Sequence, residues 1–252
     1  MKLQHATWQE VEDYLQRASG IIIPIGSTEQ HGPNGLLGTD AICPESVAWE
    51  LGARHDVLVG PTQSIGMAQH HLAFPGSISL RPSTLIAVLR DTVTSLVRHG
   101  FTHVFFLNGH GGNIATVNAA FAEIYSGRSL RSDGQSSGAL HLALNNWFAG
   151  PRVRELAQSL YGDAEGGHAT ASEVSLSWFA RPEAVKDVAM SPRIAPSGSA
   201  QCDAEEFRRR FPDGRMGSDP SLSRIEHGER FQAAAVEDTW DAYRAFLGEG
   251  LQ

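Results

Sequence analysis

The chain has 252 residues, of which 41% are apolar, and it carries a formal net charge of −8 and two cysteines. This composition can bury a sizeable core, but no apolar run approaches the roughly 20 residues of a membrane helix. Two cysteines do not make a disulfide framework, and a net negative charge without a basic run argues against a nucleic-acid partner. Because the N-terminus also lacks an apolar signal region, we expect a cytoplasmic protein with neither a nucleic-acid nor a membrane partner.

Short apolar runs alternate with stretches of helical periodicity along the chain. The β-branched run at 21–25 is typical of a buried strand, and the apolar repeat at 85–97 is typical of an amphipathic helix. We expect strands at 20–25, 57–61, 102–107 and 139–144, a surface loop at 127–138, and helices at 8–17, 83–99, 114–125, 152–161, 170–179, 205–211 and 224–247, with a further helix that has Pro44 in its first turn and ends near His55. This alternation predicts an α/β fold with right-handed crossovers and a mostly parallel sheet. No repeat or boundary divides residues 1–252, so we expect a single domain.

The loop after the first predicted strand carries side chains of metal-ligand type. Glu29 and His31 are two residues apart and therefore point to the same side of an extended loop, and Asp40 follows after a glycine-rich turn. Such groups directly after a buried strand are costly unless something pairs them, and a carboxylate can bridge two cations. We interpret this loop as a metal site; the alternative is a polar loop whose charges are solvated.

Later loops carry further candidates. His110 lies in the glycine-rich loop 108–113, where neither Gly-Lys-Ser/Thr nor GxGxxG is present, so a phosphate loop is disfavoured. His168 is followed five residues later by Glu173, near the start of a predicted helix. The alternatives are a structural histidine in a tight turn and a glutamate that only complements the helix dipole. His71, which precedes an aromatic–Pro–Gly turn, is either a cleft residue or a surface histidine.

These loops can meet at one edge of the sheet. The carboxyl ends of parallel strands lie on the same side, and ligands of open α/β sheets bind in the crevice outside them. A mixed oxygen and nitrogen donor set without cysteine favours zinc, manganese or iron(II) over calcium, and we expect zinc. Two divalent cations would then share five protein ligands, namely Glu29, His31, Asp40, His110 and Glu173.

The same stretches resemble the creatininase (creatinine amidohydrolase) family over about residues 5–247. The resemblance is carried by Pro24-x-Gly26-Ser27-x-Glu29-Gln30-His31-Gly32-Pro33, Gly38-Thr39-Asp40, Phe74-Pro75-Gly76, Asn108-Gly109-His110-Gly111-Gly112-Asn113 and His168-x-x-x-x-Glu173-x-Ser175. It implies a three-layer α/β/α sandwich with a two-metal hydrolytic site. It also implies cleavage of an amide-type carbon–nitrogen bond, often in a small ring compound, and a homo-oligomer that is frequently a hexamer.

The resemblance also implies a role for each site residue. Glu29, Asp40 and His110 would hold one metal, and His31, Asp40 and a further carboxylate would hold the other, with Asp40 bridging. His168 matches the family histidine that handles protons during hydrolysis. In creatininase proper the further carboxylate is a glutamate two residues after the glycine-loop histidine.

Three positions depart from creatininase proper. Gly112 replaces that glutamate, which leaves Glu173 as the best candidate for the second carboxylate. Ala164 stands where a tryptophan helps to enclose creatinine, and Asn34 stands where many relatives have histidine. These changes argue against creatinine itself as the substrate. Other branches that the resemblance suggests are a formylamino-pyrimidine deformylase, an inosose hydrolase and a peptidase of a redox-cofactor precursor.

We therefore predict a metal-dependent amidohydrolase that cleaves an amide-type bond, other than a peptide bond, in a small molecule by metal-activated water. His168, Glu173 and His71 are the predicted catalytic residues. The alternatives are a creatininase-family peptidase or deformylase acting on a cofactor precursor, and a non-catalytic homologue that binds a small molecule. A nucleotide-cofactor oxidoreductase is disfavoured because no dinucleotide fingerprint follows the first strand.

Overall fold

The computed structural model describes residues 1–130 and 138–248, and a parallel sheet lies at their centre. Its strand order is β2-β1-β3-β4, and all three neighbouring pairs run parallel. The strands are β1 (Gly20–Ile25), β2 (Leu58–Val59), β3 (His103–Asn108) and β4 (His141–Asn146). The predicted α/β fold with a mostly parallel sheet is confirmed in this part of the chain.

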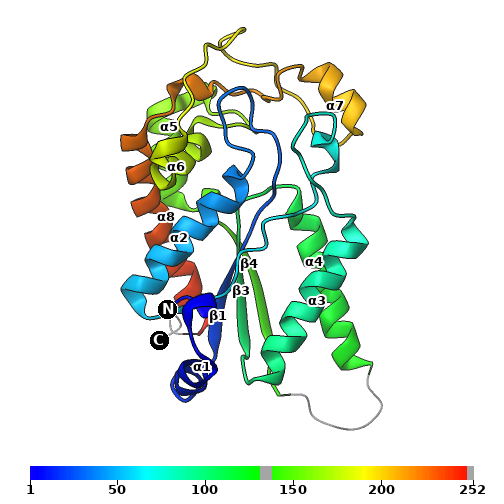
Figure 1. The fold of residues 1–252 in the computed structure, drawn as a ribbon, viewed down its shortest axis with the longest axis vertical. Helices are drawn as coiled ribbons and strands as arrows, with labels where there is room; N and C mark the ends of the chain where they lie inside the picture. The colour runs from blue at the N-terminus through cyan, green and yellow to red at the C-terminus, as the bar shows by residue number, and fades with distance from the viewer. Residues whose placement is uncertain (131–137, 249–252) are drawn as a thin grey trace.

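Helices cover both faces of the sheet, because successive side chains along β1 and β3 are apolar on both sides (Figure 1). On one face, Ile22, Phe105 and Leu107 pack in a core cluster with residues of α2, α5, α6 and α8. On the other face, Ile21, Ile23, Val104 and Phe106 pack with α1, α3 and α4. The helices are α1 (Trp8–Leu15), α2 (Thr39–His55), α3 (Pro82–Arg98), α4 (Asn113–Ser129), α5 (Pro151–Tyr161), α6 (Ala171–Ala180), α7 (Ala204–Arg210) and α8 (Ile225–Phe246).

Several predicted boundaries were wrong. β4 spans His141–Asn146 rather than 139–144, because its ladder with β3 starts at the pair His103 and His141 and continues through the polar residues Asn145 and Asn146. Helix α4 runs to Ser129, so the first residues of the predicted surface loop 127–138 are helical, while 131–137 lie outside the described residues. Helix α2 begins at Thr39, which places Pro44 inside the helix rather than in its first turn.

The early start of α2 positions the site. A proline has no N–H for the carbonyl four residues before it, so Pro44 leaves the Asp40 carbonyl without a helical partner. Glycines at the ends of β1 and β3 lie against the same carbonyl: a Cβ on Gly26 would be 2.1 Å from the Asp40 oxygen, and one on Gly109 would be 2.0 Å away. Only glycine therefore lets both strand ends approach the start of α2 this closely. None of the helices in the described part of the chain combines the length and the apolar character that a bilayer crossing requires.

Candidate metal centre

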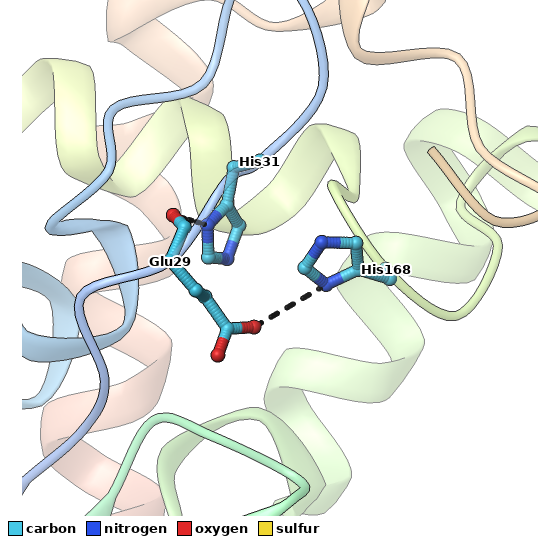
Figure 2. Close-up of side chains that lie close together, drawn as sticks. All are labelled: Glu29, His31 and His168. Atoms are coloured by element: carbon cyan, nitrogen blue, oxygen red, sulfur yellow. Dashed lines mark hydrogen bonds and ion pairs between the residues drawn. The ribbon is translucent and has the colours of Figure 1, made fainter. Parts of the chain in front are cut away.

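The loop after β1 places one imidazole by a backbone contact. His31 is buried, and its Nδ1 lies 3.1 Å from the carbonyl oxygen of Glu29 (Figure 2). A ring nitrogen facing a carbonyl carries the proton, so Nε2 presents its lone pair to the cluster. This Nε2 lies 3.0 Å from Oδ1 of Asp40, which stands in the first turn of α2, where the positive end of the helix dipole favours a carboxylate.

The loop after β3 places the second imidazole. Asn108 braces this loop, because its side chain donates to the carbonyl of His110 and accepts from the N–H of the same residue. His110 Nε2 lies 3.0 Å from the Met67 carbonyl, which fixes the proton there and leaves Nδ1 facing Oδ2 of Asp40 at 3.0 Å. His110 Nε2 is also 3.2 Å from Oε2 of Glu29. Glu29, Asp40 and His110 thus form one set whose ligand-type atoms lie within 4.8 Å of one another.

Glu173 reaches the cluster from the start of α6. Its Oε1 accepts the N–H of Thr170, and the Thr170 hydroxyl accepts the N–H of Glu173, which together make a capping box. The same Oε1 lies 3.9 Å from Nε2 of His31. His31, Asp40 and Glu173 form a second set within 4.8 Å, so Asp40 is common to both sets.

The arrangement of the ligand-type atoms suits coordination of divalent cations better than hydrogen bonding among these side chains. Both carboxylate oxygens of Glu29 and Oδ2 of Asp40 are buried and accept no hydrogen bond from the described residues, although imidazole nitrogens lie 3.0–3.2 Å away. Atoms that coordinate one ion at 2.0–2.1 Å lie about 3.0–3.4 Å from each other, which matches these separations. Buried carboxylates without donors are costly unless a cation pairs them.

The charges of the cluster residues also favour the binding of a cation. Burial alone would lower the pKa of His31, but the carboxylates of Asp40 and Glu173 outweigh it and raise this pKa to about 10. Against the same burial, Glu29 and Asp40 raise the pKa of His110 to about 9. Burial raises the pKa of Glu173 to about 7. In the absence of metal, the carboxylates therefore hold protons on the two imidazoles at neutral pH, in the places that cations would take.

His168 and His71 border the first set and share one partner, Gln30. His168 Nε2 lies 2.9 Å from the Gln30 carbonyl, so it carries the proton and Nδ1 faces Glu29 Oε1 at 3.8 Å (Figure 2). The Gln30 amide nitrogen lies 2.9 Å from His71 Nδ1, which turns His71 Nε2 toward Glu29 Oε1 at 3.1 Å. Burial, together with the neighbouring His71 and His31, lowers the pKa of His168 well below its usual value, so this ring is neutral. Glu29, His31 and His168 form a third set of ligand-type atoms within 4.8 Å.

The structure therefore gathers every side chain that the sequence singled out for the site, His71 included. The gathered residues are Glu29, His31, Asp40, His71, His110, His168 and Glu173. Gln30 was not predicted as a site residue, although its place between two ligand-type residues was a usable signal. His70 was also missed; it is buried beside His71 and forms no hydrogen bond among the described residues.

The three departures from creatininase proper have separate structural settings. A Cβ on Gly112 would lie 2.4 Å from His110 Nε2 and 2.8 Å from the Met67 carbonyl, so a side chain does not fit there. Asn34 donates to the carbonyl of Pro220, which ties the first loop to the segment before α8. Ala164 is buried, and its carbonyl accepts the N–H of Asp219.

Comparison with known proteins agrees with this geometry. The model of the creatininase family, described as creatinine amidohydrolase, matches residues 4–243. A mycofactocin precursor peptide peptidase of Mycobacterium ulcerans is 30% identical over 235 residues, which are 86% of this chain and 82% of that protein. The protein of the same description from Mycolicibacterium smegmatis is 35% identical over 115 residues, and this match spans 43% of the chain and only 46% of that protein's length.

Solved structures show the same fold. A tryptophan-to-phenylalanine variant of creatininase superposes with a TM-score of 0.82 at 24% identity and covers 97% of both chains. Creatininase structures described as a manganese form and a Zn-Zn type each have a TM-score of 0.81 at 24% identity, and each comparison covers 97% of both chains. Because the family model spans nearly all of the sequence, the chain belongs to the creatininase family of hydrolases.

Proposed function

We propose that the chain is a metal-dependent amidohydrolase with two divalent cations, built as one domain over residues 1–252. The observation that carries this proposal is Asp40, whose two oxygens face different imidazoles: Oδ1 lies 3.0 Å from His31 Nε2 and Oδ2 lies 3.0 Å from His110 Nδ1. A carboxylate in this position is suited to bridge two cations. Glu29, Asp40 and His110 would hold the first cation, and His31, Asp40 and Glu173 would hold the second.

Cations bound here would lower the pKa of a coordinated water and polarise the carbonyl of an amide. Side chains of the protein supply the proton transfer and the positioning of the ligands. His168 is neutral and directs Nδ1 at the cluster, so it can accept the proton that water loses and return it to the leaving nitrogen. Water thus adds across the carbon–nitrogen bond: the carbon gains the hydroxyl and the nitrogen gains the proton. His71 positions the Glu29 carboxylate, which Nε2 approaches at 3.1 Å.

Zinc is the proposed metal, with manganese or iron(II) as alternatives. The support is the donor set, which contains imidazole nitrogens and carboxylate oxygens and no thiolate. Both cysteines are free, and the buried Cys43 points its thiol at the Glu173 carbonyl rather than into either set. The creatininase forms with manganese and with zinc support the same choice by analogy.

The proposed substrate is an amide of a small molecule. A second candidate is the amide of a short peptide or cofactor precursor, which the long match to the M. ulcerans peptidase favours. The remaining alternative is a homologue that binds a small molecule without catalysis. The variant His168→Asn distinguishes the two, because only an enzyme can lose turnover on this substitution. By resemblance to the family, we further propose a cytoplasmic homo-oligomer, with the hexamer as the expected form.

Chelation tests the function directly. We expect dialysis against a strong chelator to abolish hydrolysis of any amide that the protein cleaves, and added zinc or manganese to restore it. The matched control is the same dialysis followed by magnesium, which binds such nitrogen-containing sites poorly. Full activity in a sample shown by elemental analysis to contain no metal would contradict the proposal.

A further inference from the structure

Two cavities of similar size border the metal cluster. The first chamber, about 540 Å³, is lined by Trp147, Val153, Arg154, Ala157 and Glu165 together with the cluster residues Asp40 and Glu173. The second chamber, about 530 Å³, is lined by Met67, His70, Ala115, Ala200, Phe207 and Met216. Both chambers share the residues His110, Gly111, Gly167 and His168. The cluster therefore lies at a junction rather than at the bottom of a single pocket.

Two of the four residues that line both chambers are glycines, so few side chains separate the chambers. A Cβ on Gly111 would have no atom within 4 Å, so the backbone there borders open space. Gly167, the residue before His168, also lines both chambers. Drug-sized ligands fill pockets of about 300–1,000 Å³, so each chamber alone could hold a small ring. A chain that continues on both sides of the cleaved bond is the ligand that uses both chambers.

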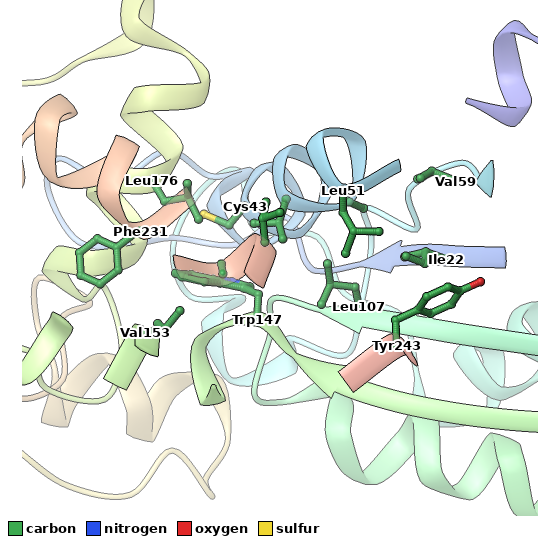
Figure 3. Close-up of a cluster of buried hydrophobic side chains, with 14 of the residues drawn as sticks. Ile22, Cys43, Leu51, Val59, Leu107, Trp147, Val153, Leu176, Phe231 and Tyr243 are labelled. Carbon is green, nitrogen blue, oxygen red and sulfur yellow. The ribbon is translucent and has the colours of Figure 1, made fainter. Parts of the chain in front are cut away.

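The first chamber offers an unpaired cation. Arg154 stands on α5 at the exposed edge of the chamber, and its guanidinium has no hydrogen bond or ion pair among residues 1–130 and 138–248. Glu165 does not neutralise it, because its carboxylate is engaged by the N–H and hydroxyl of Ser172. The apolar wall is fixed, since Trp147 and Val153 belong to the core cluster between the sheet and α8 (Figure 3). An arginine fork at such a rim matches a carboxylate.

The second chamber offers an unpaired neutral imidazole. His70 is only 7% exposed and lines the cavity, and its ring packs on His71 at 4.1 Å and on Phe207 at 5.4 Å between ring centroids. No hydrogen bond to either ring nitrogen is made by any described residue. Burial and the adjacent His71 lower the pKa of His70 to about 4, so the ring keeps one donor and one acceptor. Its ring nitrogens are not among the fully buried polar atoms, so they are open to the cavity that His70 lines, where a backbone amide of a ligand chain can bind them.

We propose that the substrate is an extended, peptide-like amide that crosses the cluster, with a free carboxylate held by Arg154 in the first chamber and a backbone amide held by His70 in the second. This inference rests on the proposed amidohydrolase function and adds the substrate class and two residues that determine specificity. It places the departing, carboxylate-bearing part of the chain on the α5 side of the bond.

The experiment uses the zinc-loaded full-length protein and two matched probes. One is a pool of N-acetylated hexapeptides with free terminal carboxylates, and the other is the same pool amidated at that end. We expect the acid pool to be cleaved with a kcat/KM at least about tenfold higher, because a charge-assisted arginine–carboxylate pair is worth about that factor or more. Arg154→Gln should remove this preference, while Arg98→Gln, an exposed arginine of α3 outside both chambers, should leave it intact.

His70 is tested in the same assay. His70→Phe keeps the ring packing but no hydrogen-bonding nitrogen, and we expect KM for both pools to rise about tenfold with metal content unchanged. His70→Asn, which restores a donor, should recover part of this loss. A merely structural role would give the opposite order, with phenylalanine tolerated better than asparagine in the buried position.

Three outcomes would overturn the inference. The first is an unaltered acid preference in Arg154→Gln. The second is hydrolysis of a small cyclic amide such as creatinine without cleavage of either pool, which leaves the amidohydrolase function standing. The third applies if no probe is cleaved. Each pool is then titrated calorimetrically into the zinc-loaded His168→Asn protein, and the absence of binding would exclude a peptide-like ligand.

Discussion

The cluster has two halves, the first set with Glu29 and the second set with Glu173, and these two carboxylates are held in different ways. In the first half, Glu29 is fully buried, and neither of its oxygens accepts a hydrogen bond within the part of the chain that the structure describes. In the second half, the Glu173 side chain is 13% exposed, and its Oε1 already accepts the Thr170 N–H at the start of α6. One carboxylate thus has no role in the fold that competes with a cation, whereas the other caps a helix as well.

This difference predicts unequal affinities. Burial raises the pKa of Glu173 to about 7, so a proton competes with a cation for this carboxylate at neutral pH and wins as the pH falls. The arrangement follows from the crowding at Gly112, where a carboxylate on the glycine loop would collide with His110 and Met67. We infer that the second cation binds more weakly than the first because its carboxylate comes from a helix cap.

The largest effect is expected at the residue that both halves share. Asp40→Asn removes the negative charge from both proposed sets, so we expect metal content to fall from two ions per chain toward none and activity to fall by at least about a thousandfold. Elemental analysis of the purified variant with kinetic assay measures both quantities.

Asp238→Asn is the matched control for this substitution. Asp238 is also buried and paired, through Arg152 and the N–H of Val153, but it lies on α8 away from the cluster. Its loss should lower the free energy of unfolding by about 1–3 kcal/mol and leave the metal content at the parent value. An Asp40→Asn protein that retains two ions per chain would exclude the bridging role.

A smaller and more selective effect is expected from Glu173→Gln. Glutamine keeps the capping box but lacks the charge, so we expect one ion to be lost, the first ion to stay, and activity to fall about a hundredfold. The chain contains a second capping box, Thr7 with Glu10 on α1, and Glu10→Gln there should change neither metal content nor activity. If Glu173→Gln keeps two ions, the second carboxylate comes from another residue.

The sequence predicted the candidate ligands that directly follow a strand better than it predicted the boundaries of the neighbouring elements. Glu29, His31 and His110 follow β1 and β3, whose unbroken apolar runs made both strands and their ends predictable. The true start of α2 at Thr39 was hidden because Pro44 normally marks a first turn, and this proline is tolerated inside the helix. The polar end of β4 was also missed, since only its pairing with β3 reveals it as strand.

Long-range contacts set the limit of the sequence prediction. Gln30 joins His71, His168 and Gly214, which are distant in the chain, and no local pattern encodes such a meeting. The second chamber is likewise closed by Phe207 of α7, which packs on the rings of His70 and His71 only in the folded protein. Residue types at strand ends were therefore readable, whereas their supporting partners were not.

The smallest effect is expected at Gln30, which contacts His71 and His168 at the border of the first set. Gln30→Met keeps the length of the side chain but removes the donor that fixes His71 and the contact near His168 Nε2. Because such supporting partners typically contribute a factor of about 10–100, we expect kcat to fall by about tenfold while metal content stays at the parent value. A role in orienting imidazoles also predicts a changed pH–rate profile, which a packing defect alone would not produce. Gln63→Met is the matched control, since among the described residues the Gln63 side-chain amide donates only to the nearby Ile65 carbonyl. Equal losses in both variants would exclude the positioning role of Gln30.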